Sequence, residues 1–96
     1  MENVLKLLKA DLGIKSTARD EYFSSLLKAD FEEIKRKGVV LDLTAVEDQV
    51  LLSDYTAYKY RHRHENVSLA RNIQLRIRNR IMRKRAQGGG GDDESE

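Results

Sequence analysis

Four segments of this 96-residue chain carry apolar side chains three and four residues apart, which is the spacing that places them on one face of an α-helix. Residues that can cap or end a helix separate the segments, and no proline interrupts any of them. The stretch Val39–Leu43 has the composition of a β-strand, but the chain offers no second strand to pair with it. The sequence therefore predicts an all-α domain of four helices, with Val39–Leu43 as an extended connector lying on the core.

The first two expected helices end at glycines. A short helix is expected over residues 2–11, with Gly13 as its stop, because glycine readily adopts the left-handed conformation that ends many helices. A longer helix is expected to begin near Ser16 or Thr17, either of which can cap the free N–H groups of its first turn, and to end at Gly38. Its apolar face comprises four residues at helical spacing: Phe23, Leu27, Phe31 and Ile34.

The last two expected helices, also long, begin at hydroxyl residues. Thr44 and Glu47 match a capping box, in which the hydroxyl caps the helix and the carboxylate three residues later hydrogen-bonds back. This helix is expected to reach about His64 and to bury one face: Val46, Val50, Ala57 and Tyr58, with Leu51 and Leu52 beside them. Ser68 is expected to cap the fourth helix, whose apolar stripe repeats every four residues: Leu69, Ile73, Ile77 and Ile81.

Charge is distributed unevenly along the chain. Residues 1–60 carry nine basic and eleven acidic side chains, residues 61–85 carry nine basic and one acidic, and residues 86–96 carry four acidic and no basic ones. We therefore expect a helical domain over residues 1–87 and a flexible, glycine-rich, acidic tail over residues 88–96. A strongly basic helix attracts phosphates, an acidic protein surface or the acidic tail of the chain itself.

The composition argues against several kinds of site. The absence of cysteine removes disulfides, thiolate nucleophiles and thiolate metal ligands. His62 and His64 are two residues apart and would lie on nearly opposite sides of a helix, whereas two metal ligands on one helix need a spacing of three or four. Asp54 is expected to form a structural hydrogen bond or ion pair between helices. We therefore expect no enzyme, no cofactor and no metal, and no apolar run is long enough to cross a membrane.

The basic helix and the residues before it are the candidate interaction surface. The planar guanidinium of arginine favours defined contacts with carboxylates or phosphates, and no acidic residue lies between Arg71 and Arg85. Tyrosine beside arginine, as in Tyr60–Arg63, suits either base stacking or a protein interface. The arginines of the helix form two rows, and the sequence leaves open which way each row faces. The candidate residues are Tyr60, Arg61, Arg63, Arg71, Arg76, Arg78, Arg80, Arg83, Lys84 and Arg85.

An ordered series of short stretches resembles the small head–tail connector, or adaptor, proteins of tailed bacteriophages, also described as DNA-packaging proteins. The likeness covers about residues 4–82, and no single stretch of it is a strict signature. In chain order the stretches are Asp11-Leu12-Gly13-Ile14, Arg19-Asp20-Glu21-Tyr22, Leu26-Leu27, Gly38-Val39-Val40-Leu41-Asp42, Glu47-Asp48, Leu51-Leu52-Ser53-Asp54-Tyr55, Tyr60-Arg61-His62-Arg63, Leu69, Gln74-Leu75-Arg76 and Arg78-Asn79-Arg80.

The resemblance implies an all-α structural protein without enzymatic activity, located at the head–tail interface of the virion and, during assembly, in the host cytoplasm. It also implies a ring of about twelve copies bound to the portal protein, a tail-side completion or stopper protein as the next partner, and double-stranded DNA passing non-specifically through the channel. The C-terminal segment of such proteins commonly reaches along the portal, although the acidic tail here is short for that role. The alternative is a small nucleic-acid-binding protein that uses its Arg-rich helix.

Overall fold

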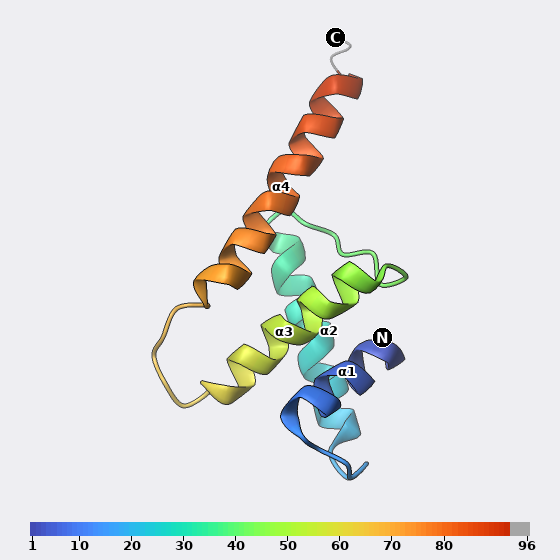
Figure 1. Ribbon diagram of the computed structural model, residues 1–96, viewed down its shortest axis with the longest axis vertical. Helices are drawn as coiled ribbons and strands as arrows, with labels where there is room; N and C mark the ends of the chain where they lie inside the picture. The colour runs from blue at the N-terminus through green and yellow to red at the C-terminus, as the bar shows by residue number, and fades with distance from the viewer. Residues whose placement is uncertain (93–96) are drawn as a thin grey trace.

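The computed structural model describes the backbone of residues 1–92 and the side chains of residues 1–86, and within that part of the chain it contains four helices and no strand. The helices are α1 (Glu2–Leu12), α2 (Asp20–Arg36), α3 (Val46–Arg61) and α4 (Arg71–Asp92), so the predicted all-α fold is confirmed (Figure 1). The predicted flexible acidic tail lies outside the fully described residues and stays a prediction.

The first three helices form the body of the molecule. The core contains Val4 and Leu8 of α1, Phe23, Leu27 and Ile34 of α2, and Leu51, Leu52, Tyr55 and Ala57 of α3. Removing these apolar side chains from water is the main favourable contribution to folding. The predicted connector is confirmed, because Val39 and Leu41 are buried while Val40 between them and Asp42 after them are exposed.

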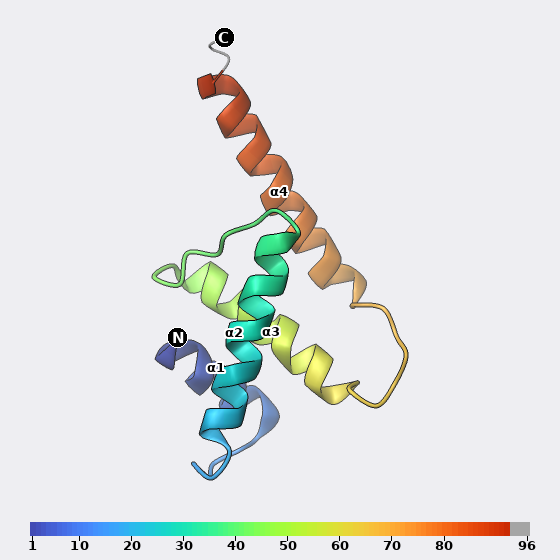
Figure 2. The same ribbon diagram turned by 180° about the vertical axis from the view of Figure 1, so that it is seen from behind.

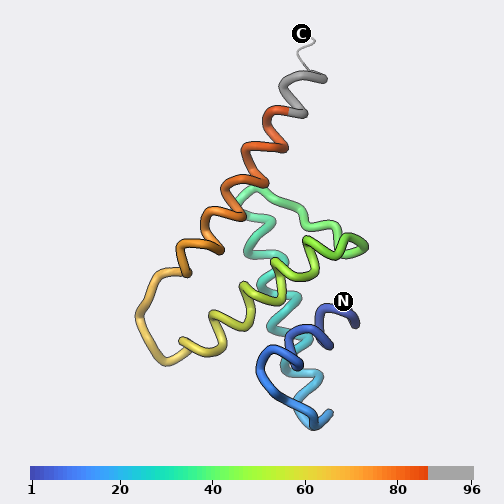
Figure 3. Tube along the Cα trace, viewed as in Figure 1, coloured from blue at the N-terminus to red at the C-terminus, as the bar shows by residue number. Residues whose placement is uncertain are grey.

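The fourth helix packs on this body through its first half and then extends beyond it (Figures 1 and 2). Ile73 and Ile77 are buried and Ile81 is half-buried, which confirms the predicted isoleucine stripe. Gly38, with a φ of +113°, ends α2 beside α4, where an added Cβ would stand 3.7 Å from Ile81. Residues 82–86 are all exposed, so α4 leaves the body after Ile81. The Cα trace in Figure 3 shows the same departure.

Three predicted helix starts are wrong, and each helix begins later than its hydroxyl residue. Ser16 accepts a hydrogen bond from the Ala18 N–H at 3.0 Å inside a turn, and α2 starts at Asp20. The Thr44 hydroxyl donates to the Asp42 carboxylate instead of capping α3. The Ser68 carbonyl accepts from the Tyr58 hydroxyl at 2.9 Å, and α4 starts at Arg71. Serine and threonine stabilise turns by the same local hydrogen bonds that they use in caps, so their presence locates an element start only approximately.

The predicted buried face of α3 is also partly wrong. Val46 is 70% exposed and Val50 lies at the surface, whereas Tyr55 is fully buried. The helix contacts α1, α2 and α4 at once, so its buried residues do not follow a single stripe. On α2, Phe31 is half-buried and Phe23 is the fully buried aromatic side chain.

The candidate interaction surface of α4

One arginine row of α4 faces α3 and pairs with its carboxylates. Arg76 Nη1 lies 2.9 Å from Asp54 Oδ2, which confirms the predicted structural ion pair of Asp54. Arg80 donates through both Nη atoms to Asp48, and its Nη2 lies 3.0 Å from Oδ2. Arg80 and Arg83 each approach Glu47 at 4.0 Å. We call Arg76, Arg80 and Arg83 the inner row, because their charges meet partners within the fold.

The most deeply buried member of these pairs is Asp48, which is 1% exposed. Besides Arg80, its carboxylate accepts the Asp42 backbone N–H at 2.6 Å, so one side chain fixes both the connector and α4. Burial alone would raise the pKa of Asp48, but the hydrogen bonds from Arg80 and from the Asp42 N–H outweigh burial and hold that pKa below its usual range. The carboxylate therefore stays ionised beside the guanidinium.

The other arginine row points to solvent. Arg71, Arg78 and Arg85 are exposed, as is Lys84, and no carboxylate among the residues with described side chains forms an ion pair with any of the four. We call Arg71, Arg78 and Arg85 the outer row. Two apolar side chains, Leu75 at 41% and Met82 at 55% exposure, lie beside it at the same seven-residue spacing. The outer row and these two residues form a mixed basic and apolar face.

The tyrosine and arginine residues at the end of α3 are largely engaged with the body. The Tyr60 hydroxyl accepts a hydrogen bond from Arg19 Nη1 at 2.9 Å, and its ring packs against Phe23 with centroids 5.2 Å apart. The Arg63 guanidinium lies 3.9 Å from the centre of the Tyr60 ring. Arg61 Nη2 lies 3.0 Å from Asp11 Oδ2 and donates to the Asp11 carbonyl at 2.9 Å. These contacts tie the end of α3 to α1 and α2, and Phe23 and Arg63 pack on the Tyr60 ring.

A polar cluster between α2 and α3 was not predicted from the sequence. Asp30 is 5% exposed and accepts hydrogen bonds from Thr56 Oγ1 at 2.8 Å and Lys59 Nζ at 3.1 Å. Lys59 Nζ also lies 2.7 Å from Glu33 Oε1, while the Tyr55 hydroxyl donates to Glu33 at 2.5 Å. Burial raises the pKa of Asp30, and the hydrogen bonds from Thr56 and Lys59 only partly offset that effect. One residue could have indicated this cluster from the sequence: Asp30 lies between Leu27 and Ile34 on the apolar face of α2, where a charged side chain needs a polar partner.

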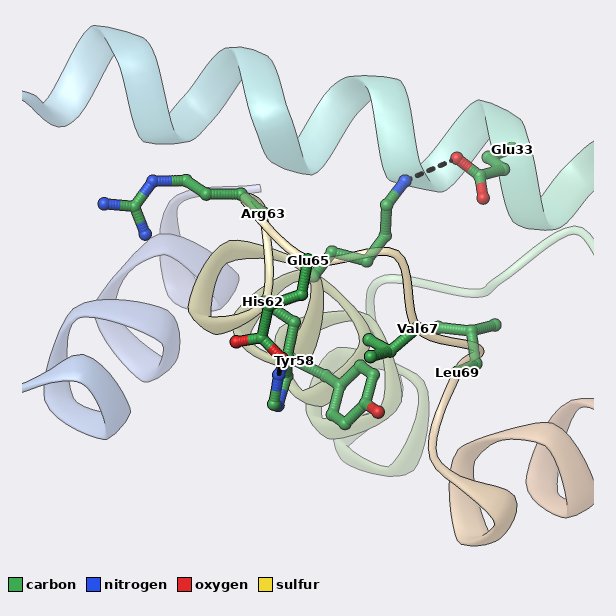
Figure 4. Close-up of a pocket in the computed structure, with 8 residues that line it drawn as sticks. Glu33, Tyr58, His62, Arg63, Glu65, Val67 and Leu69 are labelled. Atoms are coloured by element: carbon green, nitrogen blue, oxygen red, sulfur yellow. Dashed lines mark hydrogen bonds and ion pairs between the residues drawn. The ribbon is translucent and has the colours of Figure 1, made fainter.

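A surface pocket of ≈ 330 Å³ lies where α3 runs into the connector to α4 (Figure 4). It is lined by Glu33, Tyr58, Lys59, His62, Arg63, Glu65, Val67 and Leu69. His62 Nδ1 lies 3.2 Å from Glu65 Oε1, and the His62 ring packs against Tyr58 at 4.4 Å between centroids. Across the described residues, no group of three histidine or carboxylate side chains is arranged to hold a metal ion. Within the pocket, His62 therefore contacts both Glu65 and Tyr58.

Of the ten candidate residues, the structure engages six within the fold: Tyr60, Arg61, Arg63 and the inner row. The other four, Arg71, Arg78, Lys84 and Arg85, remain as the exposed cationic surface. Within residues 1–92, no helix combines the length and apolar character needed to cross a membrane. Comparison of the chain with protein-family models, with curated proteins and with solved structures finds no match.

Proposed function

We propose that this chain is a structural subunit of the head–tail connector of a tailed bacteriophage. In this role it assembles as a ring on the portal vertex, extends the DNA channel and offers a docking surface to tail-side proteins. The observation that carries the proposal is the fourth helix, which leaves a small three-helix body after Ile81 and presents the outer row to solvent. A projecting basic helix on a compact body suits a protein that joins larger assemblies.

Spare apolar surface on the body supports the same proposal. Val40, Val46 and Val67 are each more than half exposed, and they lie on three different parts of the chain. Exposed apolar side chains gain stability when a neighbouring subunit covers them. Such surface suits a subunit that is completed by copies of itself, by the portal protein and by the next tail-side protein.

The division of the arginine rows also fits a ring around DNA. The inner row is paired with carboxylates of α3, so among the basic residues of α4 the outer row and Lys84 remain for a polyanion or an acidic protein surface. A channel that lets DNA pass needs weak, sequence-independent contacts with phosphates, because strong contacts would retain the DNA.

The test is co-sedimentation of the full chain with the portal ring encoded by the same genome, with electron microscopy of the fast fraction. We expect one copy per portal subunit and an added disc at one end of the ring. Phage particles made without the protein should fill with DNA but fail to keep it or to join tails. Normal, infectious particles made without this protein would overturn the proposal.

The outer row also favours a second candidate, a nucleic-acid-binding protein. Phosphate contacts by Arg71, Arg78 and Arg85 would give affinity for DNA or RNA that falls steeply with salt. Substituting these three residues with glutamine should then abolish binding without unfolding the protein. The inner row is unsuitable for this test, since neutralising Arg80 also removes the partner of buried Asp48. Failure to bind DNA at low salt would remove this candidate.

A further inference from the structure

We propose that the connector between α2 and α3, Val39–Leu43, binds an extended acidic segment of a partner protein, which pairs with it as a second strand. The incoming segment forms hydrogen bonds with free backbone groups of the connector and places carboxylates against Arg83 and Lys84 of α4. These residues are not part of the outer row. The contact depends on neither a portal nor DNA, so it goes beyond the proposed function.

The connector has backbone groups that form no hydrogen bond within the described part of the chain. At its ends the backbone is engaged, because the Val39 N–H donates to the Ile34 carbonyl at 3.3 Å and the Asp42 N–H donates to a carboxylate. In between, the N–H groups of Val40 and Leu41 and the carbonyls of residues 39–41 have no partner among residues 1–92. Figures 1 and 2 show the connector at an edge of the body, with no further element above it. Free backbone groups on an extended segment are what strand addition uses.

The connector is held in place before a partner binds. Val39 and Leu41 are each 4% exposed and belong to the core, whereas Val40 between them is 54% exposed. This alternation is the side-chain pattern of a strand with one buried face. Because the core already fixes the connector, a pairing segment does not have to order it, which lowers the entropic cost of binding. Val40 also offers an apolar contact to a side chain of the segment.

A recess beside the connector carries positive charge. It has a volume of about 420 Å³, and no acidic side chain lines it. Its lining residues are Val39, Val40, Arg80, Arg83 and Lys84. Arg80 is paired with Asp48. Arg83 approaches Glu47 only at 4.0 Å, and Lys84 forms no ion pair with a carboxylate among residues 1–86. Arg83 and Lys84 therefore favour carboxylates on the incoming segment.

The composition of this chain argues for a different protein as the occupant. Residues 87–96 are acidic, but they include no apolar side chain that could cover Val40, and glycine and aspartate are unfavourable in strands. Pairing between the connectors of two copies would bring Arg83 and Lys84 of both copies together, and such like charges repel. The complementary partner segment therefore carries both apolar and acidic residues.

The probe is a synthetic peptide of about ten residues in which valine and glutamate alternate, because alternation places the two kinds of side chain on opposite faces of a strand. Its binding to the full chain is followed by NMR of the backbone amides at about 0.05 M salt, where charges are weakly screened. We expect the Val40 amide to shift and to exchange more slowly with solvent, because it gains a hydrogen bond. The same peptide N-methylated at every residue cannot donate backbone hydrogen bonds and should bind at least about tenfold more weakly.

Variants of the chain test the charges and the backbone separately. Arg83→Gln with Lys84→Gln should weaken binding of the peptide by at least about tenfold. The matched control, Arg71→Gln with Arg85→Gln, removes two cations of the outer row and should bind the peptide like the unmodified chain. Val40→Pro removes the free N–H and should also weaken binding. Circular dichroism checks that each variant is folded. If Val40→Pro unfolds the chain, the N-methylated peptide still tests the same hydrogen bonds.

Four results would each overturn the proposal. They are no binding of the alternating peptide at about 1 mM, full affinity of the N-methylated peptide, loss of affinity in the outer-row variant instead of the recess variant, and a short DNA duplex that shifts the Val40 amide where the peptide does not. Failure to bind a portal would leave this contact standing and would count only against the proposed function.

Discussion

The inner and outer arginine rows occupy the same helix and consist of the same residue, yet their surroundings differ. The inner row lies over the acidic residues of α3, and its central member, Arg80, contacts a carboxylate that is almost completely buried. The outer row is turned away from the body and is exposed throughout. The comparison shows that one basic helix can use some of its arginines for ion pairs within the fold and leave the others exposed to a partner.

The largest difference between the rows should appear on substitution of Arg80. Arg80→Met keeps most of the side-chain length but leaves Asp48 buried without its cation, which should cost about 3 kcal/mol in the free energy of unfolding. Urea denaturation followed by circular dichroism measures this loss. Arg78→Met on the outer row is the matched control and should change stability by less than about 0.5 kcal/mol. Equal losses for the two variants would contradict the division into rows.

Acid should weaken the inner row selectively. The pKa of Asp48 is lowered in the folded protein, so its stabilising contribution is present above its unfolded pKa of about 3.9 and is lost as the pH falls through the lower, folded value. Asp30 behaves oppositely, because its raised pKa means that falling pH relieves an unfavourable buried charge. Between about pH 6 and about pH 3, the free energy of unfolding should therefore decrease more for the wild type than for Arg80→Met. Glu33 and Asp42 also have lowered pKa values. Arg80 does not act on Glu33, but its charge helps to lower the pKa of Asp42, so the difference reports Asp48 together with a smaller contribution from Asp42. Carboxyl chemical shifts of Asp48 and Asp30 against pH would check the two directions directly.

The second member of the inner row should matter less. Arg76 and Asp54 form an ion pair in which both side chains are more than a third exposed. Such pairs contribute about 0.2–1 kcal/mol, and added salt screens them. A double-mutant cycle with Arg76→Gln and Asp54→Asn should give a coupling energy in that range, falling at high salt. A coupling above about 2 kcal/mol would mean that this pair is as important as the Arg80 pair.

The outer row should have the smallest effect on folding. Arg71→Gln, Arg78→Gln and Arg85→Gln together should change the free energy of unfolding by less than about 0.5 kcal/mol, because no described ion pair is lost. In the second candidate function, the same variant should lose its salt-sensitive affinity for DNA. Thermal unfolding and a DNA-binding assay on one sample would separate the two readouts. A marked fall in melting temperature would place the outer row among the structural residues.

The sequence determined the class of fold and the approximate positions of the helices. Apolar spacing predicted all four helices and the isoleucine stripe of α4, and glycine predicted the ends of α1 and α2, because these features depend on neighbours within a few residues. Hydroxyl residues predicted helix starts poorly, since the hydroxyls of Ser16 and Thr44 form hydrogen bonds in turns before α2 and α3, and α4 starts three residues after Ser68.

Which charged residues are structural depends on how the helices pack. Asp48 and Arg80 are 32 residues apart in the chain, and Asp30 is separated from Lys59 by 29. Patterns over a few neighbouring residues do not predict contacts between residues so far apart in the chain. The burial that strengthens these contacts arises only when the helices pack. The periodicity of α4 revealed two rows of arginines from the sequence alone. Because α4 packs on α3, the inner row forms ion pairs with carboxylates of α3, and the outer row remains exposed to solvent.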